Sequence, residues 1–492
     1  MIPFDNTYAR LPERFYAHQP LRGVPAPSIL RLNERLLKAL GTLDSAALGS
    51  REGAAVLAGA AAAPGAEPIA MAYAGHQFGH FNPQLGDGRA VLLGEFLAGD
   101  GTRYDLHLKG SGATVFSRGG DGRAALGPVI REYVVSEFMA GLRIPTTRAL
   151  AIVRTGDTVL RQRGPEPGGV LVRIAESHVR VGTFQFFAAR QDLESLRTLV
   201  DYVVRRHYPS LSDHPTPALG LFEAVCERQA ELVARWQLVG FIHGVMNTDN
   251  VSIVGETIDF GPCAFLDAYE ANKVFSSIDQ RGRYAYSNQP MIGAWNLGRL
   301  ADTLLPLIDE DEKRAIAAVE GVLDGYVKRL GTVLAAGWRA KVGLALEQPD
   351  DQSLVGRLLE AMEQGKADFT RTFRALSALG AEADTKDDAL RAEFVSTKAI
   401  DPWLADWRAR LQAEPQGDAL RQAAMTRVNP AFIPRNHQVE HAIRAAYDAE
   451  DYTRLDELLQ VARDPFTWRD AYAHLALAPT DDEEVRQTFC GT

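Results

Sequence analysis

The sequence predicts an α+β fold of two lobes, with an N-terminal extension and a C-terminal helical extension. Two observations predict it: glycine-rich, strand-like segments gather before residue 190, and helical periodicity dominates from residue 191 onward. A chain of 492 residues is also long for a single compact core. We therefore expect a partly helical N-terminal extension at 1–70, an N-lobe at 71–190, a C-lobe at 191–340 and a C-terminal helical extension at 341–492.

The first expected elements are a helix and a β-hairpin. Apolar residues at helical spacing predict an N-terminal helix over residues 29–40 (ILRLNERLLKAL). Residues 89–96 (RAVLLGEF) and 104–109 (YDLHLK) are strand-like and flank a glycine-rich turn, so they predict a hairpin. Alternation along the second strand places Tyr104, Leu106 and Leu108 on one face and Asp105, His107 and Lys109 on the other.

A helix is expected next, at about 128–142 (PVIREYVVSEFMAGL), because Pro128 suits its first turn and Gly141 its end. Two further strand-like runs, around 149–153 and 169–174, belong to the same lobe, for which we expect five strands in all. Beyond them, residues 221–238 (LFEAVCERQAELVARWQL) have a long helical pattern.

A motif typical of phosphoryl chemistry follows that helix directly. Residues 243–250 are HGVMNTDN, and Asp-Phe-Gly follows at 259–261. The spacing nearly matches the catalytic loop of protein kinases, H-x-D-x-x-x-x-N, and their metal-binding D-F-G. Together with the order of strands before helices, it predicts a protein-kinase-like two-lobe fold. Val245, however, stands where a kinase has its proton-accepting aspartate, and a valine side chain accepts no proton.

Asn250 and Asp259 are the candidate metal ligands. Phosphoryl and nucleotidyl transfer need hard oxygen ligands for Mg²⁺ or Mn²⁺, and an amide and a carboxylate supply them. We expect short strands on either side of Gly255 to hold these residues. Asp249 is the candidate proton acceptor, because it lies on the same loop one residue before Asn250. Its alternative roles are to orient the loop or to ligate a second metal through water.

Lys109 and two arginines are candidates for binding phosphates. Lys109 ends a strand, and Glu132 on the following helix is suited to hold it in place. Arg173 and Arg180 (in LVRIAESHVRVG) are suited to a bidentate grip on pyrophosphate, with surface ion pairing as the alternative. Glycine clusters at 86–89, 110–112 and 119–122 either let backbone N–H groups approach phosphate oxygens or form ordinary turns.

The bulk composition excludes several classes of protein. The net charge of −10 does not favour a binder of nucleic acid, which normally presents a basic face. The longest apolar tract, AAVLAGAAAAPG at 54–65, is too short and too weakly apolar for a membrane span, which needs about 20 residues. Three cysteines and the absence of a signal-like start predict a soluble, cytoplasmic protein that binds neither nucleic acid nor membrane.

Nine segments spread over nearly the whole chain resemble the selenoprotein O family, also called SelO or YdiU. They are GHQFG (75–79), LGDGR (85–89), HLKGSG (107–112), SRGGDGRA (117–124), REYVVSE (131–137), IPTTRAL (144–150), HGVMNTDN (243–250), GRYAYSNQP (282–290) and NPAFIPRNH (429–437). The resemblance implies ATP bound in an orientation flipped relative to kinases. It also implies transfer of AMP to Ser, Thr or Tyr hydroxyls of proteins, with release of pyrophosphate. The α-phosphorus, and not the γ-phosphorus, then meets the acceptor. A base at the kinase position would point at the wrong phosphorus, so the resemblance implies that Val245 is expected there.

The resemblance also implies a role for each matching position. Asp249 matches the proton acceptor of the family, Asn250 and Asp259 match its metal ligands for Mg²⁺ or Mn²⁺, and Glu132 matches the carboxylate that pairs with the lysine. The implied nucleotide contacts are Gly86, Gly88, Arg89, Lys109, Asp121, Gly122, Arg173, Arg180 and Asp259. Cys490 occupies the place where some members carry selenocysteine, and a regulatory disulfide from it is a hypothesis.

Other functions remain alternatives at this point. The alternatives are a transferase of UMP from UTP, a kinase that uses Asp249 as its base, and a pseudokinase scaffold that binds nucleotide without turnover. Val245 argues against the kinase, and the full set of metal and phosphate residues argues against the scaffold. The sequence leaves the protein substrates, the choice between Mg²⁺ and Mn²⁺ and the oligomeric state open.

Overall fold

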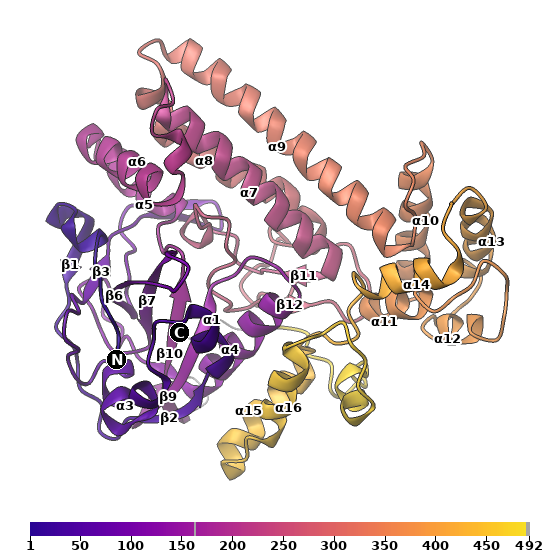
Figure 1. Cartoon of the computed structure of the whole chain (residues 1–492), viewed down its shortest axis with the longest axis horizontal. Helices are drawn as coiled ribbons and strands as arrows, with labels where there is room; N and C mark the ends of the chain where they lie inside the picture. The colour runs from indigo at the N-terminus through magenta and orange to yellow at the C-terminus, as the bar shows by residue number, and fades with distance from the viewer. Residues whose placement is uncertain (162–163, 489–492) are drawn as a thin grey trace.

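The computed structural model describes residues 1–161 and 164–488 of the chain. Strands gather in the N-terminal third, at the left of Figure 1, and helices make up most of the remainder. This is the α+β, kinase-like order that the sequence predicts. Among the described residues, no helix is both long and apolar enough to cross a membrane. Cys490 lies outside the described residues, so the hypothesis of its disulfide stays a prediction.

One antiparallel sheet of eight strands organises the N-terminal part, where five strands were expected. Its order is β1 (Tyr16–His18), β3 (Ile69–Met71), β6 (Ala90–Leu97), β7 (Arg103–Lys109), β10 (Gly164–Ala175), β9 (Arg148–Arg161) and β2 (Ser28–Leu32), and β8 (Ala124–Ala125) pairs with β10. The predicted hairpin is confirmed as β6 and β7. The additional strands come mostly from residues before 71, which pair with both edges of the sheet. These edge strands are short, which is why their alternation is hard to recognise.

The predicted helix over residues 29–40 is wrong in its first half. Residues 28–32 form β2, which pairs with β9 in the register Ile29 to Val153 and Leu32 to Ala151. The helix begins only after Asn33, as α1 (Glu34–Leu40). Asn33 accepts a hydrogen bond from the backbone N–H of Leu36 at 3.0 Å, which is an N-cap that separates strand from helix.

The two faces of the sheet differ in chemistry. Leu106 and Leu108 of β7 lie in an apolar core with α1 and α3 (Arg51–Leu57), and Tyr104 packs at its edge, as the alternation predicts. Asp105, His107 and Lys109 point to the other face and are also buried. The predicted helix at 128–142 is confirmed as α4 (Leu126–Gly141). A buried polar face therefore lies between the sheet and the helical part of the chain.

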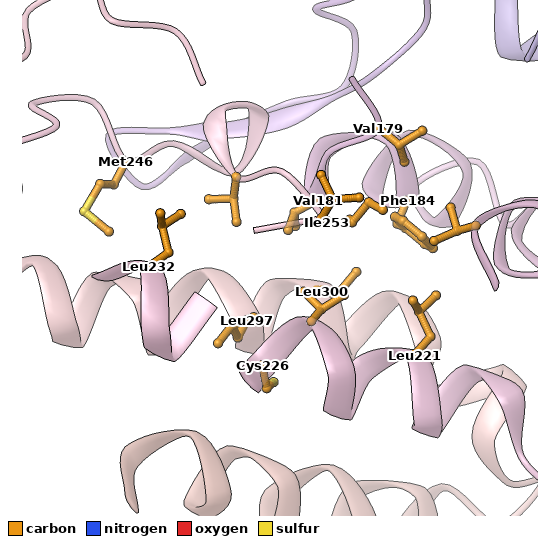
Figure 2. Close-up of a cluster of buried hydrophobic side chains, with 14 of the residues drawn as sticks. Val179, Val181, Phe184, Leu221, Cys226, Leu232, Met246, Ile253, Leu297 and Leu300 are labelled. Carbon is orange, nitrogen blue, oxygen red and sulfur yellow. The ribbon is translucent and has the colours of Figure 1, made fainter. Parts of the chain in front are cut away.

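The helices that follow the sheet are α5 (Val181–Ala188), α6 (Leu193–His207) and α7 (Pro217–Val239), and after the predicted catalytic loop come α8 (Gln289–Ile308) and α9 (Glu312–Lys341). Figure 2 shows Leu221 and Leu232 of α7 and Leu297 and Leu300 of α8 facing Met246 and Ile253, which flank residues 247–250 of the loop. The loop therefore rests on a rigid apolar base.

The strands expected on either side of Gly255 are wrong. Ser252 and Thr257 make only isolated bridges, to Arg180 and Thr146 respectively. The short hairpin of this region lies farther out, as β11 (Phe241–Ile242) and β12 (Ala264–Phe265). Residues 252–257 therefore make their backbone bridges to Thr146 and Arg180, and they do not pair with each other as two strands.

The C-terminal extension is helical, as expected, and has two parts (Figure 1). The helices α10 (Asp351–Gln364), α11 (Phe369–Leu376), α12 (Asp387–Arg391), α13 (Ile400–Leu411) and α14 (Asp418–Thr426) lie at the right of the view, around a core that also includes residues of β11 and β12. The helices α15 (Asn436–Ala449) and α16 (Thr453–Ala462) pack against α4. Just before α15, the buried Arg435 donates to Asp267 at 2.6 Å and to Asp368 at 2.8 Å.

Candidate functional site

Lys109 lies at the centre of the buried polar face. Its Nζ donates to Oε2 of Glu132 on α4 at 2.6 Å and to Oδ1 of Asp259 at 2.7 Å. Lys109 is the last residue of β7, and Glu132 lies within α4, so the contact joins the sheet to the helix. The predicted lysine–glutamate pair is therefore formed, and it also reaches the residue that the sequence assigns to the metal.

Both candidate arginines converge on Asp259 rather than forming surface ion pairs. Nη1 of Arg173 lies 2.7 Å from Oδ1 of Asp259, and Nη1 of Arg180 lies 3.5 Å from Oδ2. Arg180 also donates to the carbonyl of Asp249 at 3.1 Å, and each of the two arginines is about 2% exposed. Three cations thus surround one carboxylate in the interior, which is an arrangement suited to a strongly anionic ligand.

The charge of Asp259 is fixed by these neighbours. Burial alone would raise its pKa, but the charges of Lys109, Arg173 and Arg180 outweigh burial and hold the pKa well below its usual range. Asp259 has a φ of 63°, a left-handed conformation that is uncommon for a residue other than glycine. Such backbone strain persists where the surrounding structure dictates it, and it is frequent at functional sites.

The catalytic-loop candidates lie on a single 3-10 turn, η4 (Thr248–Asn250). Asn250 donates its Nδ2 to the carbonyl of Val245 at 2.9 Å, so its side-chain oxygen is the atom left to bind a ligand. Asp249 accepts a hydrogen bond at Oδ2 from Nε2 of Gln77 at 3.1 Å. Its Oδ1 is buried, with no hydrogen-bond partner among residues 1–161 and 164–488.

Burial also changes the acidity of Asp249. It raises the pKa of this carboxyl to about 6, and the hydrogen bond from Gln77 opposes the rise. A Cβ added at Gly75 would lie 2.7 Å from Oδ1 of Asp249, so the glycine leaves room beside that oxygen. The pKa suits a group that must take up a proton near neutral pH.

The glycine clusters form tight turns beside Lys109. Gly86 has a φ of 68°, and a Cβ there would overlap the ring of Phe116. Gly122 has a φ of 64°, and its carbonyl accepts from the N–H of Gly112 at 3.1 Å. The clusters at 110–112 and 119–122 are therefore adjacent in space. Positions 86 and 122 both require glycine, because a side chain would clash or strain the backbone.

Three predicted nucleotide contacts lie at the margin of this cluster. Gly88 closes the turn at 86–88, and Arg89 directly precedes β6. The side chain of Asp121 is half exposed and binds Arg161 at 2.8 Å and the backbone of Arg123 at 3.0 Å. The structure therefore brings Lys109, Glu132, Arg173, Arg180 and Asp259 into direct contact and joins the loop to them through the carbonyl of Asp249, which Asn250 follows in sequence, while Asp121 pairs with Arg161 instead.

The comparison with protein families agrees with this geometry. The sequence model of the family described as "Protein adenylyltransferase SelO" matches residues 1–463. The chain belongs to the SelO family. A relative from Rhizobium rhizogenes, named "Protein nucleotidyltransferase YdiU", is 55% identical over 491 residues, covering 100% of this chain and 97% of the relative. A relative with the same name from Rhodopseudomonas palustris is 56% identical, covering 100% and 99%. The predicted family is confirmed, and the chain is a nucleotidyltransferase.

The oxygen donors of this SelO-family site are of the chemical type that binds divalent cations. Among the described residues there is no group of three or more His, Cys, Asp or Glu side chains that could hold a metal. The candidate donors are instead the amide oxygen of Asn250 and the carboxylate of Asp259, whose oxygens accept from Lys109, Arg173 and Arg180. A small number of protein ligands is enough for Mg²⁺ or Mn²⁺ at a nucleotide site, because phosphates and water complete the coordination.

Sequence reasoning missed three residues of the SelO-family site. Gln77 donates a hydrogen bond to Asp249. His107 lies within hydrogen-bond distance of Arg173, and Asp87 lies within hydrogen-bond distance of His107. The available signal was their position inside two of the matching segments, GHQFG and LGDGR, and on the strand face that carries Lys109. An isolated glutamine or histidine in a strand gives no further indication of function.

Proposed function

We propose that this SelO-family nucleotidyltransferase transfers AMP from ATP to Ser, Thr or Tyr hydroxyls of proteins and releases pyrophosphate. The observation that carries the proposal is the position of the cations. Lys109, Arg173 and Arg180 meet at Asp259. Arg180 also contacts Asp249, the candidate base on the loop, whereas the position of the kinase base is occupied by Val245. The site is built to bind a polyphosphate and to accept a proton at a point displaced from that of a kinase.

Each residue of the site has a role in this reaction. Asp249 accepts the proton of the acceptor hydroxyl, whose oxygen forms a bond to the α-phosphorus of ATP. The bond from the α-phosphorus to the bridging oxygen breaks, and pyrophosphate leaves with the electron pair. Arg173 and Arg180 bind the β- and γ-phosphates and stabilise the charge that develops on the leaving group. Glu132 keeps Lys109 extended toward the same phosphates.

The remaining predicted residues hold the nucleotide. Asn250 and Asp259 would hold Mg²⁺ or Mn²⁺, which supplies neutralisation of phosphate charge when bound. Gly86, Gly88 and Gly122 let backbone N–H groups approach the nucleotide, and Arg89 and Asp121 contribute at its rim. Two buried free thiols, Cys226 and Cys263, support a reducing, cytoplasmic location.

The test uses ATP labelled at either the α- or the γ-phosphate, with purified protein, candidate protein substrates and Mg²⁺ or Mn²⁺. We expect protein-bound label from α-labelled ATP alone, lost in Asp259→Ala and kept in Asp213→Ala, an exposed aspartate. Label from the γ position would make the enzyme a kinase that uses Asp249. Preferential label from α-labelled UTP would make it a UMP transferase. Nucleotide binding with no transferred label would leave a pseudokinase scaffold.

A further inference from the structure

We propose that Asp87 and His107 are positioning residues that aim Arg173 at the phosphates, an inference that rests on the nucleotide site proposed above. His107 on β7 and Arg173 on β10 are directly opposite each other in the sheet. Nδ1 of His107 lies 3.0 Å from Nη2 of Arg173, and Nε2 lies 3.2 Å from Oδ2 of Asp87. Asp87, His107 and Arg173 are each at most 2% exposed.

The chemistry of the arginine sets the tautomer of His107. A guanidinium has donors and no acceptor, so Nδ1 of His107 accepts from Arg173 and carries no proton. The ring proton is then on Nε2, which donates it to the carboxylate of Asp87. Burial lowers the pKa of His107 below its ordinary value, and Asp87 only partly opposes this. The ring is therefore neutral at neutral pH, with one acceptor and one donor in fixed directions.

The hydrogen bonds that run from Asp87 through His107 to Arg173, here called the relay, leave Arg173 little freedom to rotate. Its Nη1 is engaged with Asp259 at 2.7 Å, and its Nε is buried with no hydrogen-bond partner in the described part of the chain. His107 is thus the contact that prevents the guanidinium from turning fully onto Asp259 and Glu132. The ring of His178 stacks on His107 with centroids 4.2 Å apart, which fixes the plane of the imidazole as well.

Asp87 links the relay to the glycine turn. It lies between Gly86 and Gly88, and its Oδ2 also accepts from the backbone N–H of Met71 at 3.0 Å. One carboxylate therefore holds both the turn that approaches the nucleotide and the histidine that orients Arg173. This accounts for a buried carboxylate that touches neither the proposed metal ligands nor Asp249.

The test compares binding of ATP and AMP, because Arg173 is assigned to phosphates that AMP lacks. We expect His107→Leu to weaken binding of Mg-ATP at least about tenfold and to leave the affinity for AMP unchanged within about twofold, a difference of about 1.4 kcal/mol. His107→Gln should retain most of the affinity for ATP, since its amide offers one acceptor and one donor. His437→Leu removes a buried histidine on α15 and serves as the matched control for loss of packing.

The outcomes separate this proposal from the proposed function. Wild-type protein that binds ATP no better than AMP would overturn the polyphosphate site itself. A preference for ATP that survives in His107→Leu, or equal losses of ATP and AMP binding in that variant, would overturn only the relay. Nitrogen-15 NMR of histidine-labelled wild-type protein adds a measurement that needs no foldable variant. His107 is expected as the Nε2–H tautomer, and the Nδ1–H tautomer or an imidazolium at pH 7 would contradict the proposal.

Discussion

The Nζ atom of Lys109, at the end of β7, lies 2.6 Å from Oε2 of Glu132 in the middle of α4. Both side chains are less than 10% exposed, so the pair is held away from solvent. In protein kinases, an ion pair between a strand lysine and a helix glutamate accompanies the active arrangement of the lobes. In this chain the helix that carries the glutamate is additionally covered by α15 and α16.

Glu132→Gln should lower both stability and nucleotide binding. The substitution leaves Lys109 with Asp259 as its remaining carboxylate, and we expect the free energy of unfolding to fall by about 1–3 kcal/mol. Urea denaturation and titration with Mg-ATP measure the two effects. Glu137→Gln is the matched control on the same helix, because it breaks the pair with Arg148 at 2.8 Å. Equal loss of ATP binding in the control would show that the effect is general to α4.

Asp249→Asn should abolish transfer while leaving nucleotide binding intact. The amide keeps the volume of the carboxylate but cannot take the proton of the acceptor, so we expect a loss of about 10²–10⁴-fold in kcat. The affinity for ATP should change little, because the phosphates are assigned to Lys109, Arg173 and Arg180. Steady-state kinetics and equilibrium binding test this together. Retention of most of the wild-type kcat would exclude Asp249 as the base.

Gly122→Ala should disrupt the turn beside the nucleotide. Its φ is 64°, and a Cβ would overlap the backbone of Gly112 and Ala113. Gly101→Ala is the control for backbone strain alone, since its φ is 85° but a Cβ there has no neighbour within 4 Å. We expect the control to lose about 1 kcal/mol of stability and to keep ATP binding, whereas Gly122→Ala loses both. The same affinity for ATP in the two variants would refute a role for this turn.

Lys341 should make stability depend on pH above neutrality. Burial lowers the pKa of Lys341 to about 7, although Asn429 accepts from its Nζ at 2.8 Å. Between that pKa and about 10.4 in the unfolded chain, the unfolded state binds more protons, so the free energy of unfolding rises with pH at up to about 1.4 kcal/mol per unit. Below pH 7 this contribution is at its minimum. Lys341→Met should remove the slope, and identical pH profiles for variant and wild type would disprove it.

Arg435→Leu should destabilise the attachment of the C-terminal extension. The substitution leaves the buried Asp368 and the partly buried Asp267 without their common cation. We expect the free energy of unfolding to fall by about 3–5 kcal/mol, as for other buried ion pairs that lose one partner. Arg357→Ala breaks an exposed pair with Asp406 and should leave the denaturation midpoint unchanged. Equal midpoints for both variants would count against a stabilising role for Arg435.

The sequence was sufficient to predict the order of the lobes and one of the central ion pairs, between Lys109 and Glu132. The residue types that bind phosphate and metal are distinctive, and their spacing on a strand, a helix and a loop leaves few ways to combine them. Lys109 and Glu132 could be predicted as a pair for this reason, and the structure brings them into contact. The arginines at 173 and 180 were ambiguous, because an arginine that binds phosphate and one in a surface ion pair look alike in a sequence.

The errors came from contacts between distant segments. The residues around Ile29 have helical spacing, but pairing with β9 overrides the local preference and makes them a strand. The residues around Gly255 bridge instead to Thr146 and Arg180, which no local pattern reveals. His107 and Asp87 were overlooked for the same reason, since their partners lie on other strands and turns.

Arg435 forms its ion pairs with two aspartates that precede it by long stretches of chain. During synthesis Asp267 and Asp368 leave the ribosome well before their arginine, so the growing chain holds two acidic groups that still lack a partner. Residues 436–462, which cover α4, emerge later still. Because a chain is synthesised from its N-terminus, the face of α4 that these residues bury stays without its cover until most of the chain has been made.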